Sequence, residues 1–334
     1  MEQRDGEMIK NQWYGILDSK ELKKKKLYGV TRMGEKLVLW RDENNDICCI
    51  ADKCCHQGAS LSIGSFADNG HNSIACPFHG FEYEKSGRVS RIPANGSNTP
   101  VPDRYRVNAY RAKEAYGFIW LWYGDYTKAE LPEIPFFDEL KEGYSYFGFH
   151  EYWPVHYTRA IENQLDVVHL PFVHGNSIGR GNNKLVNGPV VKWEGNLMTF
   201  YVDNEVDDGK TVPLKPSEVE QKKNYRDLFH LQFQMPNLWQ NIISDDMRIV
   251  AVFAPVDEEN TCIYIRSYQR FANIPILRYF INRLSNIGNK YILHQDRRVV
   301  VTQRPVRSEL SMDEKLIQGD LPIIEYRKRR NSLL

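Results

Sequence analysis

Two stretches, CCHQGASLSIG at 54–64 and CPFHGFEYEKSGRV at 76–89, decide how this sequence is interpreted. The first contains a C-x-H box, Cys54 with His56, and the second a C-x-x-H box, Cys76 with His79. Nineteen residues separate the two boxes, and five of the six cysteines fall within 29 positions. Clustering of this kind is not typical of a disulfide framework, so it indicates a metal site.

Two thiolates and two imidazoles can hold either of two inorganic groups. One is a tetrahedral zinc ion, and the other is a [2Fe–2S] cluster with two Cys on one iron and two His on the other. Each box pairs one Cys with one His, which two loops require if each supplies a ligand to both irons. Zinc sites more often group Cys with Cys and His with His. Gly58 and Gly80 follow the histidines and permit tight turns, so the cluster is favoured.

The two stretches closely resemble the ligand loops of the Rieske domain. This resemblance implies that the four ligands Cys54, His56, Cys76 and His79 hold a Rieske [2Fe–2S] cluster. Gln57 departs from the family, which very often has Arg after the first histidine. The departure affects a local charge contact and none of the ligands.

A second candidate metal site lies in AIENQLDVVHLPFVHG, residues 160–175. If this stretch is helical, Asp166 and His169 share one face. His174 reaches the same side if Pro171 distorts the helix. Two imidazoles and a carboxylate from elsewhere would form a 2-His-1-carboxylate triad, which leaves coordination positions open for dioxygen on Fe(II).

The spacing Asn163-x2-Asp166-x2-His169-x4-His174 resembles the mononuclear iron motif of the Rieske non-heme iron oxygenases. The resemblance implies that His169 and His174 are iron ligands. It also implies a bridging role for Asp166, which would hydrogen-bond His169 in its own chain and His79 of a neighbouring chain. A carboxylate that accepts from two ligand imidazoles orients both and links the two redox centres.

The third iron ligand must be a carboxylate. The family supplies an Asp from a late helix, often followed by Gln, and YILHQDRRVVVTQRP at 291–305 offers Asp296 with Gln303 seven residues later. The alternative is a surface Asp paired with a neighbouring arginine. Glu309 and Asp313 are weaker candidates for the ligand.

The pattern of apolar runs predicts two domains of an α+β protein. Short β-branched and aromatic runs divided by turns predict an all-β Rieske [2Fe–2S] domain over 8–125. Alternating strands and a late helix at about 276–302 resemble the helix-grip (START-like) catalytic domain of these oxygenases, with an antiparallel sheet, over 126–334. The basic stretch 326–334 is expected to lie in solvent.

Composition excludes several classes of protein. The 334 residues contain 44 Lys and Arg against 43 Asp and Glu, so no excess of basic charge indicates nucleic-acid binding. No apolar run approaches the 18 residues or so that a membrane-spanning helix needs. Residues 1–13 lack the apolar core of a secretory signal, which predicts a cytoplasmic protein.

The two sites together predict a terminal oxygenase. No G-x-G-x-x-G fingerprint follows a strand, so NAD(P)H is expected to act only through a separate reductase, or a reductase with a ferredoxin. The chain resembles the shorter homotrimeric enzymes that hydroxylate or oxidatively demethylate a small apolar or aromatic molecule, monooxygenases rather than ring-cis-dihydroxylating dioxygenases. Two alternatives remain: a Rieske electron-transfer or redox-sensing protein with a ligand-binding second domain, and a zinc-stabilised binding protein.

Overall fold

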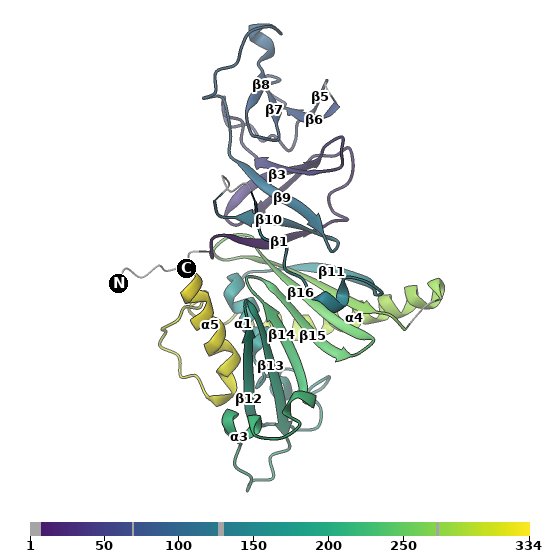
Figure 1. Cartoon of the computed structure of the whole chain (residues 1–334), viewed down its shortest axis with the longest axis vertical. Coiled ribbons are helices and arrows are strands. Elements are labelled where there is room, and N and C mark those ends of the chain that lie inside the picture. The colour runs from purple at the N-terminus through teal and green to yellow at the C-terminus, as the bar shows by residue number, and fades with distance from the viewer. Residues whose placement is uncertain (1–7, 69, 126–129, 272–273) are drawn as a thin grey trace. The chain divides into compact units, whose positions relative to one another are not determined.

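The computed structural model describes residues 8–68, 70–125, 130–271 and 274–334 (Figure 1). The chain divides into two compact units. One unit contains Asn11–Ile134 together with Ala254–Asp257. The other contains Pro135–Phe253, Glu258–Leu334 and the described residues before Asn11.

The first unit is built on a six-stranded antiparallel sheet in the order β1-β10-β9-β4-β3-β2. Its strands are rich in Trp, Ile, Leu and Val, and the side chains on the inner face are almost completely buried. The short apolar runs from which the sequence predicts strands include 38–40, 47–51 and 118–122, and all three lie in this sheet. Its strands are β1 (Gln12–Asp18), β2 (Tyr28–Arg32), β3 (Glu35–Arg41), β4 (Ile47–Ala51), β9 (Ala109–Ala115) and β10 (Phe118–Tyr123).

A smaller four-stranded sheet in the same unit, ordered β5-β6-β7-β8, positions the two Cys/His boxes. The first box lies in the loop between β4 and β5, and the second lies in the loop between β6 and β7. The strands are β5 (Ser65–Ala67), β6 (Gly70–Ala75), β7 (Glu82–Glu84) and β8 (Val89–Arg91).

The second unit contains a seven-stranded antiparallel sheet in the order β11-β17-β16-β15-β14-β13-β12. Six of these strands coincide with runs that predict strands from the sequence, and β15 is the one that was not predicted; the predicted runs are 147–153, 190–193, 198–206, 229–235, 249–254 and 262–268. The strands are β11 (Ser145–Trp153), β12 (Leu185–Glu194), β13 (Leu197–Glu205), β14 (Phe229–Gln234), β15 (Leu238–Ser244), β16 (Met247–Pro255) and β17 (Thr261–Gln269).

Helices pack against this sheet. The long helix α4 (Pro275–Val300) contacts β11 and β17 and also α1 (Tyr157–Leu165) and α2 (Leu170–Val173). The short α3 (Pro216–Glu220) and the C-terminal α5 (Leu321–Leu333) contact β12 (Figure 1). Among the described residues, no helix combines the length and the hydropathy that crossing a membrane requires.

The C-terminal helix corrects one expectation. The basic stretch 326–334 does not extend into solvent, because α5 buries Tyr326, Arg327 and Arg330. Burial of Arg327 is possible because its guanidinium donates to both carboxylate oxygens of Glu162, at 2.6 and 2.9 Å, and to Glu314 at 2.8 Å. The paired charges let a basic sequence pack as a core helix.

Candidate metal centres and cavity

The two loops that carry the Cys/His boxes have the same backbone hydrogen bonds. In the first, the Cys54 N–H donates to the Ala59 carbonyl at 2.7 Å and the Gly58 N–H donates to the Cys54 carbonyl at 2.9 Å. In the second, the Cys76 N–H donates to the Phe81 carbonyl at 2.9 Å and the Gly80 N–H donates to the Cys76 carbonyl at 3.0 Å. Both glycines have positive φ, 76° and 70°. Each loop therefore curls back on its own cysteine.

The cysteines and histidines of the two boxes differ in exposure. Cys54 and Cys76 are each 3% exposed, whereas His56 and His79 lie in solvent-exposed positions with ring centroids 4.7 Å apart. Burial raises the pKa of the Cys76 thiol, and the adjacent Cys54 raises it further. Buried sulfur in this setting stays ionised only beside a cation, so this donor set suits a cluster with a sulfur side and an outer histidine side.

Tyr83, on β7, contacts the sulfur side. Its hydroxyl lies 3.1 Å from Cys54 Sγ and 3.2 Å from Cys55 Sγ, and it accepts from the Cys55 backbone N–H at 3.0 Å. The hydroxyl therefore donates its single proton toward sulfur. Sequence reasoning assigned Tyr83 no role, although it lies within the second quoted stretch.

The expectation of one helix carrying Asp166, His169 and His174 is wrong. Helix α1 ends at Leu165, and Asp166 has an extended conformation. Its Oδ1 accepts from the backbone N–H groups of Val168 at 2.6 Å and His169 at 3.1 Å, a local turn that competes with the helix. His169 and His174 instead flank the single-turn helix α2 at its two ends.

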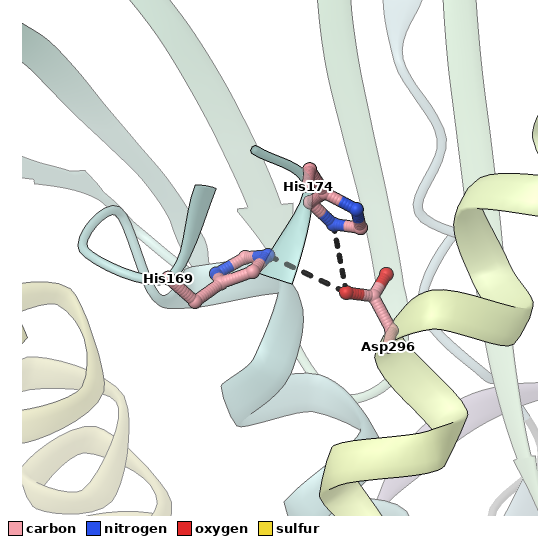
Figure 2. A group of neighbouring side chains, drawn as sticks. All are labelled: His169, His174 and Asp296. Atoms are coloured by element: carbon pink, nitrogen blue, oxygen red, sulfur yellow. Dashed lines mark ion pairs between the residues drawn. The ribbon is translucent and has the colours of Figure 1, made fainter. Parts of the chain in front are cut away.

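His169, His174 and Asp296 nevertheless come together (Figure 2). Asp296 Oδ1, on α4, lies 2.9 Å from His174 Nε2 and 3.5 Å from His169 Nε2. One ligand atom from each residue lies within 4.8 Å of the other two. The weaker candidates are elsewhere: Asp313 is exposed beside Lys315, and Glu309 pairs with Arg307.

Hydrogen bonds at Nδ1 of His169 and His174 fix the tautomer of each imidazole. His174 Nδ1 lies 2.8 Å from Gln295 Oε1, which also accepts from the Ser177 hydroxyl at 3.0 Å. His169 Nδ1 lies 3.0 Å from the Asp166 carbonyl oxygen, and the Asp166 carboxylate is 3.8 Å away. Each neutral ring therefore has its proton on Nδ1 and its lone pair on Nε2.

This arrangement fits a bound cation. Two Nε2 lone pairs converge on Asp296 Oδ1, a buried oxygen that has no hydrogen-bond donor among the described residues. Three acceptors facing one point repel one another unless a positive ion lies between them. A set of two nitrogens and one carboxylate is the facial triad of Fe(II) sites.

The electrostatics of the site agree with this assignment. Burial lowers the pKa of His169, but Asp166 and Asp296 outweigh burial and raise the pKa to about 10. Burial raises the pKa of Asp296, yet His169 and His174 bring it below its usual range. The surrounding carboxylates thus favour positive charge at the point where the three ligand atoms meet.

A cavity of about 360 Å³ opens beside the triad, within the same unit. Its lining is mostly Ile, Leu, Val, Phe and Trp, from α2, α4 and strands β13 to β17. None of the described residues that line it is Lys or Arg. A mostly apolar cavity next to a metal site is the usual form of a small-molecule site.

Two known domain families match the chain. The Rieske [2Fe-2S] domain matches residues 12–111, and the vanillate O-demethylase oxygenase C-terminal domain matches residues 153–334, more than half of the chain. The chain belongs to the Rieske non-heme iron oxygenases. A Rieske oxygenase carries a [2Fe–2S] cluster and a mononuclear iron, and this chain has the His–His–Asp group for that iron.

Individual relatives place the chain within this family. Methylxanthine N3-demethylase NdmB of Pseudomonas putida is 26% identical over 316 residues, 91% of this chain and 82% of NdmB. The vanillate O-demethylase oxygenase subunit of a Pseudomonas species is 31% identical over 147 residues, 44% of this chain. Chloroplastic chlorophyllide a oxygenase of Chlamydomonas reinhardtii is 35% identical over 52% of this chain, but the match spans only 26% of that protein.

Solved structures support the same architecture. NdmA of Pseudomonas putida CBB5 matches with a TM-score of 0.74 at 21% identity, over 96% of this chain and 89% of NdmA. Dicamba monooxygenase bound to dicamba matches with a TM-score of 0.73 at 18% identity, over 98% of this chain and 97% of that one. The Rieske oxygenase fold, with an N-terminal β domain and a C-terminal domain on an antiparallel sheet, therefore covers nearly the whole chain.

Proposed function

We propose that this Rieske oxygenase is a terminal oxygenase that hydroxylates or oxidatively demethylates a small, largely apolar organic molecule. The observation that carries the proposal is that the three ligand atoms of His169, His174 and Asp296 open onto an apolar cavity. Iron at this position supplies dioxygen activation, because the facial triad leaves coordination sites free. The cavity would position the substrate and exclude water from the reacting atoms.

In this proposal the four residues Cys54, His56, Cys76 and His79 hold the Rieske cluster. The buried cysteines would fix it in the fold, and the exposed histidine side would be where electrons enter and leave. The missing nucleotide fingerprint supports a separate NAD(P)H-dependent reductase, or a reductase with a ferredoxin, as electron donor.

Asp166 is proposed to link the two redox centres between neighbouring chains of a homotrimer. Its Oδ1 is occupied by backbone N–H groups, while the side chain keeps 28% of its surface exposed. The second oxygen would therefore be able to accept from His79 of a neighbouring chain. Light scattering on the purified protein tests the trimer, and a monomer at micromolar concentration would contradict it.

The reaction class and the location complete the proposal. Relatives named as demethylases and monooxygenases favour monooxygenation over ring dihydroxylation. A cytoplasmic location is consistent with six cysteines that form no disulfide.

His169→Ala tests the catalytic assignment. The variant should lose substrate-dependent oxygen uptake and one iron per chain, falling from about three irons to about two, while the two labile sulfides and the cluster spectrum remain. His294→Ala is the matched control, because His294 is an exposed histidine on α4 that pairs with Glu151. Turnover that survives His169→Ala would show that the catalytic assignment is wrong, whereas an unaltered protein that binds no iron beyond the two of the cluster would favour a Rieske electron carrier with a ligand-binding second domain.

A further inference from the structure

A group of exposed lysines surrounds the first cluster loop. Four of them, Lys23–Lys26, are consecutive and lie just before β2, and two more are Lys36, on β3, and Lys53. All six are exposed, and none forms an ion pair with another residue that the structure describes. We call Lys23–Lys26, Lys36 and Lys53 the lysine patch. Unpaired like charges in one region raise the local potential and attract an anionic partner.

Backbone packing places the four consecutive lysines beside the first loop. Leu27, directly after Lys26, packs against the apolar core that contains Cys54. Gly29, on β2, lies against the same loop so closely that a Cβ atom there would be 2.6 Å from Ser62 Oγ. Strand β2 is at the edge of its sheet, so the lysines that precede it face solvent at the margin of the loop.

The other two lysines of the patch are closer still to the cluster ligands. The carbonyl of Lys36 accepts a hydrogen bond at 2.8 Å from the Asp52 N–H, two residues before Cys54. Lys53 is the residue before Cys54, and its Cε atom would lie 3.5 Å from a Cβ atom at Gly58. The patch therefore extends from the start of β2 to the ligand loop itself.

The acids beside the patch are already engaged. Hydrogen bonds from the backbone and ring of His71 lower the pKa of Glu43, and the charge of Lys25 contributes less. Glu35 accepts a hydrogen bond from the Tyr110 hydroxyl. Six lysines outnumber these two exposed acids, so the patch keeps a positive charge.

The basic residues that follow the second loop are different, because they are paired. Lys85 lies 3.2 Å from the Asp42 carboxylate, and Arg91 lies 3.0 Å from the Glu82 carboxylate. Pairing of this kind leaves little net charge to attract a partner. The unbalanced positive charge is therefore concentrated around the first loop.

We propose that the lysine patch is the docking surface for the electron donor, and that this donor is a small acidic iron–sulfur protein of the ferredoxin type. One electron passes from the reduced donor to the oxidised cluster near the exposed His56, and no atom is transferred. The second loop then remains free for His79 to face the neighbouring chain. Electron-transfer encounters bury little surface, so charge brings the partners together. This inference rests on the proposed function only in taking the four ligands to hold a Rieske cluster.

Binding of a plant-type [2Fe–2S] ferredoxin, an acidic protein whose potential lies below that of Rieske clusters, tests the inference. Dissociation constants are measured by calorimetry on the cluster-loaded protein. The salt concentrations are about 10 mM NaCl, where charges act over about 30 Å, and about 1 M, where they act over about 3 Å. Lys24→Glu with Lys26→Glu should weaken binding about 10-fold at the lower concentration and have no effect at the higher one.

Two further variants locate the surface. Lys210→Glu with Lys223→Glu is the matched control, because it makes the same change in net charge at two exposed lysines of the other compact unit. It should leave ferredoxin binding close to that of the unaltered protein. Lys53→Glu should weaken binding about 3-fold at low salt, because the docked donor covers the first loop. The absorption spectrum of the cluster, unchanged in every variant, shows that each one has folded.

Four results would overturn the inference. They are no binding of ferredoxin at low salt, equal weakening by the patch variant and the matched control, no effect of Lys53→Glu, and binding of phosphatidylglycerol vesicles, but not of ferredoxin, that depends on the patch. The last result would assign the lysines to a membrane surface. The readout requires neither substrate nor iron at His169, so His169→Ala should bind ferredoxin normally. Failure of ferredoxin to bind would likewise leave the proposed reaction intact.

Discussion

Gln295 is predicted to act as a positioning residue for the iron ligand His174. Its Oε1 lies 2.8 Å from His174 Nδ1 and is itself held by the Ser177 hydroxyl at 3.0 Å. Gln295→Met keeps the length of the side chain but removes the acceptor, so the imidazole can rotate and can exchange tautomers. Loss of such a partner usually weakens metal binding 10- to 100-fold, which corresponds to about 1.4 to 2.8 kcal/mol.

Anaerobic titration of Fe(II) against a competing chelator measures this change directly. The absorption spectrum of the Rieske cluster serves as an internal control, because a variant that folds should retain it unchanged. Gln303→Met is the matched control: Gln303 is the glutamine that follows Asp296 in sequence, but it is exposed and lies beyond the end of α4. The reasoning is refuted if Gln295→Met holds iron as tightly as the unaltered protein, or if both variants lose affinity equally.

Further predictions concern the cluster and the buried ion pairs. Tyr83→Phe removes a hydroxyl that donates toward Cys54 Sγ and should lower the potential of the cluster by about 20 to 65 mV in a redox titration; an unchanged potential would contradict it. Arg327→Met leaves Glu162 buried with less compensation and should cost about 3 kcal/mol in urea unfolding at neutral pH. Burial raises the pKa of Glu314, but two arginines lower it overall, so its stabilising contribution is present above its ordinary value of 4.5 and lost as the pH falls. The cost of Arg327→Met should therefore shrink at acidic pH, and a cost independent of pH would argue against the pairing.

The cluster loops could be predicted from sequence because each is a local structure. Cysteine, histidine and glycine fall within five consecutive residues of each loop, and the hydrogen bonds that fold each loop lie within six. The cysteine and the histidine of one loop therefore lie close together because they are neighbours along the chain. What the sequence did not indicate is the donor to sulfur, because Tyr83 reaches Cys54 only through the pairing of the small sheet.

The iron site shows where periodicity is misleading. Counting residues placed Asp166 and His169 on one helical face, whereas the Asp166 side chain caps the next backbone N–H groups and ends the helix. The three ligand atoms still converge, because α2 and α4 pack together. Asp296 lies 122 residues beyond His174, so resemblance to the family, and not the local pattern, identified it as a ligand.

The residues that line the cavity could not be predicted from the sequence, and the reason is physical. Strand β15 has Leu238 and Gln240 fully buried on one face while Trp239 and Asn241 line the cavity on the other. With both faces covered, the alternation of polar and apolar residues that usually reveals a strand is absent. The motifs thus identify the cofactors, whereas the choice of substrate depends on contacts between strands that are distant from both motifs.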